Sequence, residues 1–140
     1  MHLIRTTTAF TIGMHAMAMV ARNHPRKMSI GKIASLCNVS EAHLAKVVQT
    51  LARSGIVKGE RGPSGGIVLK KPADSISLLD IWVAIEGGAS DEGCPFKIAS
   101  CTHGLCALGC AFKEHNQQME EVMRNTKLDA FANMSEACLA

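Results

Sequence analysis

The sequence lacks any hydrophobic run that could cross a membrane. No stretch reaches the about eighteen consecutive apolar residues that a membrane-spanning helix needs. The opening residues, MHLIRTTTAF, contain no apolar core followed by a small-residue cleavage site, so no secretory signal is predicted. We therefore expect a cytoplasmic protein without a membrane partner. In that compartment thiols stay reduced, and clustered cysteines indicate metal or redox chemistry more often than structural disulfides.

The sequence also lacks the motifs of common enzyme classes. It contains no nucleotide-binding fingerprint, no P-loop and no recognisable Ser-His-Asp set. A G-x-S-x-G pattern occurs at residues 62–66, but a strand is expected after this turn, whereas the hydrolase nucleophile precedes a helix. We expect that the protein is not an enzyme. A small redox or electron-transfer protein is the least favoured hypothesis, because it leaves the distribution of charge unexplained.

Acidic residues are scarce in the first half of the chain. Residues 1–71 contain eleven Lys or Arg and only Glu41 and Glu60, a net charge of +9. Residues 72–140 contain four basic and ten acidic residues, a net charge of −6. The basic half predicts a surface that binds a polyanion, and the acidic half indicates a different task.

Hydrophobic spacing predicts a mainly helical chain. Helices are expected over residues 8–23, 30–37, 41–54, 78–86 and 111–125. The second and third, joined by a tight turn with Ser40 as the cap, form a helix-turn-helix. Two short β runs around the turn RGPSGG predict a hairpin. The expected fold is therefore mainly α with a small β-hairpin wing: a winged helix-turn-helix followed by a long C-terminal dimerisation helix.

A winged helix presents two elements to double-stranded DNA. The second helix of the helix-turn-helix enters the major groove, and the wing follows the backbone or the minor groove. Arg61, expected at the base of the wing, suits the negative potential of the minor groove, and phosphate contacts are expected from Lys58, Lys70 and Lys71. The residues that we assign to the DNA interface are Ser40, Glu41, His43, Lys46, Lys58, Arg61, Ser64 and Gly65.

Four of the six cysteines lie close together in the segment GCPFKIASCTHGLCALGC. These are Cys94, Cys101, Cys106 and Cys110, and we assign all four as metal ligands. Converging thiolates bind zinc or the irons of an iron-sulfur cluster. Zinc sites usually contain paired C-x-x-C sequences, which are absent here, so zinc is less favoured. A thiol-disulfide switch and simple burial of the thiols remain alternatives, and Cys37 is expected in the core.

Two long segments resemble the bacterial IscR and NsrR family of iron-sulfur winged-helix transcription regulators. They are ERGPSGGIVLKKPADSISLLDIWVAIEG and VSEAHLAKVVQTLARSGIV, in which His43 and Lys46 are more similar to the nitric-oxide-sensing NsrR branch. The resemblance implies a homodimeric repressor that binds operator DNA. It also implies a 2Fe-2S or 4Fe-4S cluster, held by cysteines, that senses nitric oxide, redox state or cluster supply. Residues 1–86 would be the DNA-binding domain, 87–110 the cluster-binding loop, and 111–140 the dimerisation helix and tail.

The sequence departs from this family at the fourth cluster ligand. The IscR-like branch has a histidine three positions after the third cysteine, where this chain has Gly109. Other relatives supply an acidic residue from the first helix, near the position of Thr8. Cys110 is therefore the candidate fourth ligand, because it follows Cys106 by four residues, about one helical turn. His103 and Asp91 remain alternatives.

Overall fold

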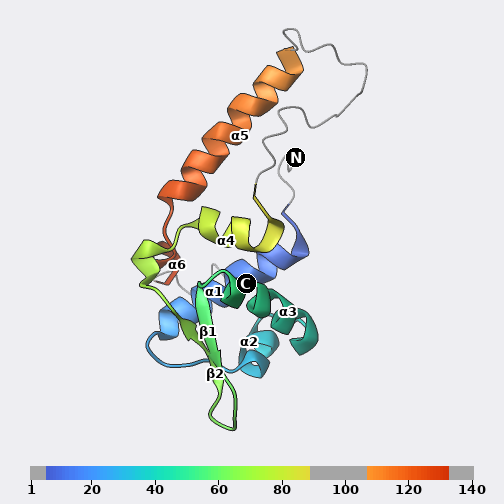
Figure 1. The fold of residues 1–140 in the computed structure, drawn as a ribbon. Helices are drawn as coiled ribbons and strands as arrows, with labels where there is room; N and C mark the ends of the chain where they lie inside the picture. Colours follow the sequence, from blue (N-terminus) through green and yellow to red (C-terminus); the bar gives the residue numbers. More distant parts are fainter. Residues whose placement is uncertain (1–5, 89–106, 133–140) are drawn as a thin grey trace.

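The computed structural model describes residues 6–88 and 107–132, which form a mainly helical body with one two-stranded antiparallel hairpin (Figure 1). The predicted fold class is confirmed. None of the described helices is both long and apolar enough to cross a membrane. The elements in chain order are α1 (Thr8–Asn23), α2 (Ile30–Leu36), α3 (Glu41–Arg53), β1 (Val57–Glu60), β2 (Gly66–Leu69), η1 (Ala73–Ser75), α4 (Leu78–Glu86), α5 (Ala107–Asn125) and α6 (Asp129–Ala132).

The first four α-helices each begin at a hydroxyl side chain that caps the free backbone N–H groups of the first turn. The caps are Thr7, Ser29, Ser40 and Ser77. At α4 the cap is reciprocal, because the carboxylate of Asp80 also accepts a hydrogen bond from the backbone N–H of Ser77, at 2.8 Å. The serine caps were predictable from sequence because each precedes an apolar helical pattern.

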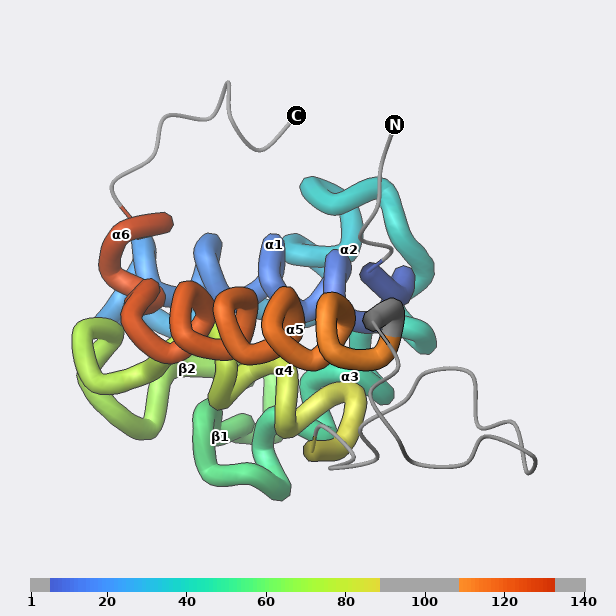
Figure 2. Tube along the Cα trace, turned by 90° about the horizontal axis from the view of Figure 1, so that it is seen from above, coloured from blue at the N-terminus to red at the C-terminus, as the bar shows by residue number. Residues whose placement is uncertain are grey.

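The core lies between α1, α3, α4 and the inner side of the hairpin. Its fully buried side chains include Met17, Leu44, Ile81 and Leu128. The chain returns to this body after α5, since the N–H of Leu128 donates to the carbonyl of Ile76 at 2.8 Å. Figure 2 shows α6 beside one end of α1. In Figure 1, α5 leaves the body on the side opposite α2, α3 and the loop of the hairpin.

The start of α5 and the end of the hairpin matter for function. The long helix α5 begins at Ala107 and not at Ala111, because the apolar helix formers after Cys106 extend it by about one turn. Strand β2 ends at Leu69, so Lys70 and Lys71 lie beyond the hairpin ladder. The helix α4 is apolar nearly all round, a pattern that predicts burial in the core or in a subunit contact, but in the described chain Val83 is 44% exposed.

A glycine permits a close junction of three helices. A Cβ at Gly13 of α1 would lie closer than 3.0 Å to Cδ1 of Ile85 in α4 and 3.2 Å from Cγ1 of Val47 in α3. With glycine at position 13 the side chain of Ile85 keeps this position, whereas a Cβ would displace its terminal methyl group. The end of α4 is thereby packed against α1, and α1 against α3, at a single point.

Candidate nucleic-acid interface

The helix α3 presents a polar face to solvent. Its opposite face is buried through Leu44, Val47, Val48 and Leu51. The exposed side chains that follow each other along the outer face are His43, Lys46, Gln49 and Arg53. The turn from α2 to α3 is fixed by the N–H of Val39, which donates to the carbonyl of Ala34 at 3.0 Å. This arrangement leaves cationic and amide donors where a recognition helix meets base edges and phosphates.

The predicted contacts at the start of α3 lie at its exposed end. The Oγ of Ser40 accepts a hydrogen bond from the N–H of His43 at 3.2 Å, so Ser40 fixes the first turn. The side chains of His43 and Lys46 are exposed, one turn apart. The structure therefore brings these three predicted residues to one solvent-facing end of the helix. Gln49, which is not among the residues assigned to DNA from the sequence, continues the same face.

Glu41 has a different position from the other residues assigned to DNA. Its Oε1 lies 3.0 Å from the place that a Cβ on Gly31 would occupy, so the carboxylate lies against the first turn of α2. The N-terminal end of a helix carries partial positive charge, which favours a carboxylate there. This placement favours a role for Glu41 in holding α2 against α3, and its assignment to DNA stays a prediction.

The wing is a short antiparallel hairpin whose register runs from the pair Val57 and Leu69 to the pair Glu60 and Gly66. Arg61 follows directly, so it lies in the connecting loop at the tip of the wing, and the expectation of a place at the base was wrong. The loop is tight, since the N–H of Gly65 donates to the carbonyl of Gly62 at 2.9 Å. A Cβ at Gly65 would lie 2.5 Å from the carbonyl oxygen of Glu60. Arg61 and the neighbouring Ser64 are exposed.

The three lysines of the wing do not share one location. Lys58 is exposed in the middle of β1, paired across the ladder with Val68. Lys70 and Lys71 lie at the end farthest from the tip, where the N–H of Lys70 donates to the carbonyl of Ile56 at 2.9 Å. Four residue pairs of strand separate the two ends, about 13 Å. Lys58 is therefore better placed than Lys70 or Lys71 to contact DNA together with Arg61.

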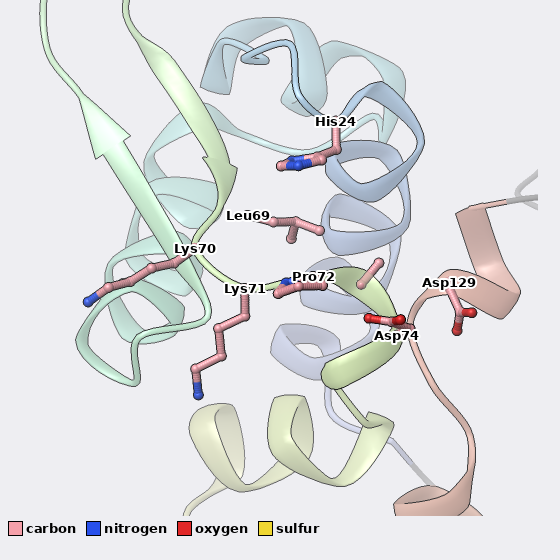
Figure 3. A pocket seen from close by; sticks show the side chains of 8 residues that line it. His24, Leu69, Lys70, Lys71, Pro72, Asp74 and Asp129 are labelled. Atoms are coloured by element: carbon pink, nitrogen blue, oxygen red, sulfur yellow. The ribbon is translucent and has the colours of Figure 1, made fainter.

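The end of the wing far from Arg61 borders an open cavity of about 520 Å³. Figure 3 shows that the side chains of Lys70 and Lys71 leave the chain in different directions and do not converge. Carboxylates lie on the opposite side of the cavity. Because charges of both signs line it, this cavity is not a concentrated anion site. Its lining residues are His24, Leu69, Lys70, Lys71, Pro72, Ala73, Asp74 and Asp129.

Sequence reasoning missed one ion pair at the wing. The Nζ of Lys27, in the segment between α1 and α2, forms a salt bridge with the carboxylate of Glu60. The hydrogen bond and positive charge of Lys27, together with the charge of Lys58, hold the pKa of the Glu60 carboxyl below its usual value. The available signal was the position of Glu60 as one of only two acids in the basic half of the chain.

Of the predicted metal ligands, Cys110 alone falls within the described residues. It is exposed in the first turn of α5. Cys94, Cys101 and Cys106 lie outside the described residues, as do the alternatives His103 and Asp91. In residues 6–88 and 107–132 no three His, Cys, Asp or Glu side chains are grouped as a metal site. Cys37 is half-buried at the end of α2, where burial raises the pKa of its thiol.

The helix α5 exposes an apolar stripe. Phe112 and Val122 are 40% and 58% exposed, and His115 and Met119 lie between them at steps of three and four residues. Such spacing places the four side chains along one side of the helix. Met123, on a neighbouring side, packs against the core instead. The sequence pattern predicts a stripe of Phe112, Met119, Val122 and Met123 for a partner helix, and the exposed stripe retains the first three of these residues.

Comparisons with known proteins agree with this geometry. The model of the Rrf2 family, described as "Iron-dependent Transcriptional regulator", matches residues 6–134. An HTH-type transcriptional regulator of Aquifex aeolicus is 27% identical over 124 residues, which cover 86% of both chains. CymR, the global cysteine regulator of B. subtilis, is 27% identical with a TM-score of 0.81, over 95% of this chain and 99% of that one.

Two further solved structures have a similar fold. CymR of Staphylococcus aureus is 27% identical with a TM-score of 0.76, over 92% of this chain and 98% of that one. IscR of T. potens has a TM-score of 0.76 at 23% identity, over 99% of this chain and 93% of that one, and at this identity it supports the fold alone. The matched family covers the winged helix, the cysteine segment and α5. The chain therefore belongs to the Rrf2 family of transcriptional regulators.

Proposed function

We propose that this regulator is a homodimeric repressor that binds operator DNA through α3 and the wing, and whose cysteine segment holds an iron-sulfur cluster. The cluster would sense nitric oxide, redox state or cluster supply. The observation that carries the DNA-binding part is that two elements, α3 and the loop of the wing, each expose basic side chains and are each fixed by hydrogen bonds. His43 and Lys46 stand on the capped end of α3, and Arg61 stands on a loop held by backbone hydrogen bonds.

Arg61 is the residue on which the wing contact depends. The guanidinium group suits the narrow, electronegative minor groove better than any other side chain in the tip. Arg61→Ala should weaken operator binding by about 1–3 kcal/mol. Gel-shift titrations at several salt concentrations measure this loss. Lys70→Ala is the matched control, because it removes a charge from the other end of the wing, and equal losses in both variants would contradict the assignment of Arg61.

The cysteine segment supplies a donor set that fits an iron-sulfur cluster. Thiolates are the usual protein ligands of such clusters, and Cys110 offers an exposed thiol at the end of α5 that lies away from the body. When bound, a cluster supplies a redox-active centre whose potential depends on its ligands and its exposure. The family description names iron, which supports a cluster over zinc. Residues 87–110 remain the proposed cluster-binding segment, with Cys110 inside the helix.

The packing around Gly13 gives this segment a route to the DNA-binding face. The segment begins just after α4, where Ile85 packs on Gly13 and Gly13 packs on Val47 of α3. The hydroxyl of Thr7, the cap of α1, also donates a hydrogen bond to the carboxylate of Glu86. A change in the segment that moves the end of α4 would therefore shift α1 and α3. Coupling of this kind changes operator affinity only if the two states of the segment favour different positions of α4.

The apolar stripe of α5 is the surface that we assign to the homodimer. Phe112 and Val122 would be covered by the same stripe of a second chain, which removes two large apolar side chains from water. A twofold dimer would also place two copies of α3 and of the wing on one face. Operators read by such dimers consist of two related half-sites about one helical turn apart or a multiple of it.

A thiol-disulfide switch without a cluster is the second candidate function. The similarity to CymR favours it, because one solved structure of S. aureus CymR is described as an oxidized form. Cys110 is exposed and could be oxidised. Zinc held by the same cysteines is a further alternative. Each alternative predicts a colourless protein, whereas an iron-sulfur protein is brown or red.

The deciding experiment is purification without oxygen followed by a visible spectrum and counts of iron, acid-labile sulfide and zinc. A coloured protein with iron and sulfide supports the cluster, and its loss in Cys110→Ser but not in Cys37→Ser would support Cys110 as a ligand. Zinc alone would support a zinc site. A colourless, metal-free protein whose DNA binding changes on oxidation would support the thiol switch.

A further inference from the structure

We propose that Lys27 is a positioning residue that holds the carboxylate of Glu60 away from Arg61 and from DNA. The wing thereby presents a basic tip although it carries an acid next to its minor-groove residue. The inference rests on the proposed DNA-binding function and concerns a residue outside both the recognition helix and the wing.

The segment that carries Lys27 is attached to the wing by backbone hydrogen bonds. Met28 and Ile67 form an antiparallel bridge, in which the N–H of Met28 donates at 3.0 Å and the N–H of Ile67 donates at 2.8 Å. A Cβ at Gly66 would lie 2.6 Å from the carbonyl oxygen of Met28, so the absence of a side chain allows this approach. Lys27 is therefore held beside the last residue pair of the hairpin.

The ion pair joins residues that are far apart in the sequence but meet at this joint. The side chains of Lys27 and Glu60 are 38% and 49% exposed, and Nζ of Lys27 binds Oε2 of Glu60. Glu60 is the single acidic residue between Val57 and Lys71. In the described part of the chain the guanidinium of Arg61 makes no ion pair, although Arg61 is adjacent to Glu60. Lys27 thus binds the carboxylate that is nearest to Arg61 in the sequence.

Without Lys27 the carboxylate would act against DNA binding in two ways. As the neighbour of Arg61 in sequence, it would be available to pair with the guanidinium, and such a pair would compete with insertion into the minor groove. It would also face DNA phosphates within one Debye length, about 10 Å at 0.1 M salt, where like charges repel. Both effects disappear if residue 60 carries no charge. This dependence separates the proposal from a direct contact between Lys27 and a phosphate.

The test is a double-mutant cycle on the full-length protein. The variants are Lys27→Met, Glu60→Gln and the two combined, titrated against a duplex that the wild-type protein selects from random sequences. We expect Lys27→Met to weaken binding by roughly two- to fivefold, in line with the screened effect of exposed charges. Glu60→Gln should bind as tightly as wild type or more tightly. The combined variant should match Glu60→Gln, since no carboxylate is left to hold.

Each alternative gives a different pattern. If Lys27 contacts a phosphate itself, Lys27→Met weakens binding equally with glutamate and with glutamine at position 60. It then also lowers the salt dependence by about one counterion in both cases, and this result would overturn the proposal. If the ion pair is only a structural brace, Glu60→Gln weakens binding as much as Lys27→Met, which also overturns it. Thermal unfolding of every variant separates lost binding from lost folding.

Arg26→Met is the matched control because Arg26 is the exposed neighbour of Lys27 and carries the same charge. Its effect should not depend on residue 60, whereas the effect of Lys27→Met should. If Glu60→Gln restored the DNA affinity of Arg26→Met, the total charge and not the position of Lys27 would be responsible, which would overturn the proposal. If the wild-type protein selects no duplex, the DNA-binding function itself fails. If it selects one and Lys27→Met binds it normally, only the present proposal fails.

Discussion

Replacing Gly13 by alanine would test the three-helix junction. The new Cβ would lie closer than 3.0 Å to Cδ1 of Ile85 and 3.2 Å from Cγ1 of Val47, whereas carbon atoms in favourable contact are about 3.5–4.0 Å apart. Overpacking of a core costs about 1–3 kcal/mol. The better helix propensity of alanine offsets about 1 kcal/mol of this loss. We expect the free energy of unfolding to fall by about 0–2 kcal/mol, toward the low end if the terminal methyl group of Ile85 can turn aside.

The matched variant is Ile85→Val, because valine lacks the Cδ1 atom that the new methyl group meets first. Alone it should cost about 0.5–1.5 kcal/mol. In combination with Gly13→Ala the loss should be smaller than the sum, with a coupling of about 1 kcal/mol. Urea unfolding followed by circular dichroism measures all three variants, and m-values show whether the transitions remain comparable. Strictly additive losses would refute the packing argument.

The same variants address the transmission of a signal. If the junction links the cysteine segment to α3, Gly13→Ala should change the ratio of operator affinities between untreated and nitric-oxide-treated protein. Gel-shift titrations of both forms give this ratio. A lowered stability with an unchanged ratio would keep the packing argument and reject the junction as the route of coupling.

Three further predictions concern the wing, the cap of α4 and the dimer stripe. Gly65→Ala should lower operator affinity, because the new Cβ would meet the carbonyl oxygen of Glu60. Gly59→Ala should be tolerated, because no atom lies closer than 3.9 Å to its Cβ. Equal affinities of the two variants in gel-shift titrations would contradict this prediction. Burial raises the pKa of Asp80, but hydrogen bonds from Ser77 and the nearby charges of Lys127 and Lys71 outweigh it and lower the pKa overall. The stabilisation is therefore present above the unfolded pKa, about 3.9, and lost as the pH falls through the lower folded value. Asp80→Asn should cost about 0.5–1 kcal/mol at pH 7 and almost nothing near pH 2, as urea titrations at both pH values would reveal. Val122→Glu should yield monomers in light scattering while Gln117→Glu, on the opposite side of α5, does not; a dimer in both would remove the stripe from the interface.

Local sequence patterns predicted most of the secondary structure. Ser40 was predicted as a cap, Ser29 and Ser77 likewise precede apolar helical patterns, and the predicted bounds of α4 agree with the structure. The hairpin followed from glycines and a proline between two β runs. These signals depend on neighbours within four residues, so a single sequence contains them in full.

The features that escaped prediction depend on contacts between distant residues. Lys27 and Glu60 are 33 residues apart, and no local pattern indicates that they meet. Glu41 was assigned to DNA from its place on the helix, yet its carboxylate lies against Gly31 of α2. The start of α5 was placed too late because the cysteines suggested a loop, although the residues between Cys106 and Cys110 favour a helix.

The two ends of the cysteine segment connect to different parts of the molecule. One end follows α4, whose residue Ile85 packs through Gly13 onto α3. The other end enters α5, whose apolar stripe we assign to the second subunit. In the proposed function, a change in the segment between α4 and α5 would therefore act between α3, which we assign to DNA, and α5, which we assign to the dimer. In a dimer with two half-sites, a small rotation of α3 relative to α5 changes the spacing of both copies of α3 together. Under the proposed function, a change that displaces the end of α4 would alter operator affinity through Gly13 and α3.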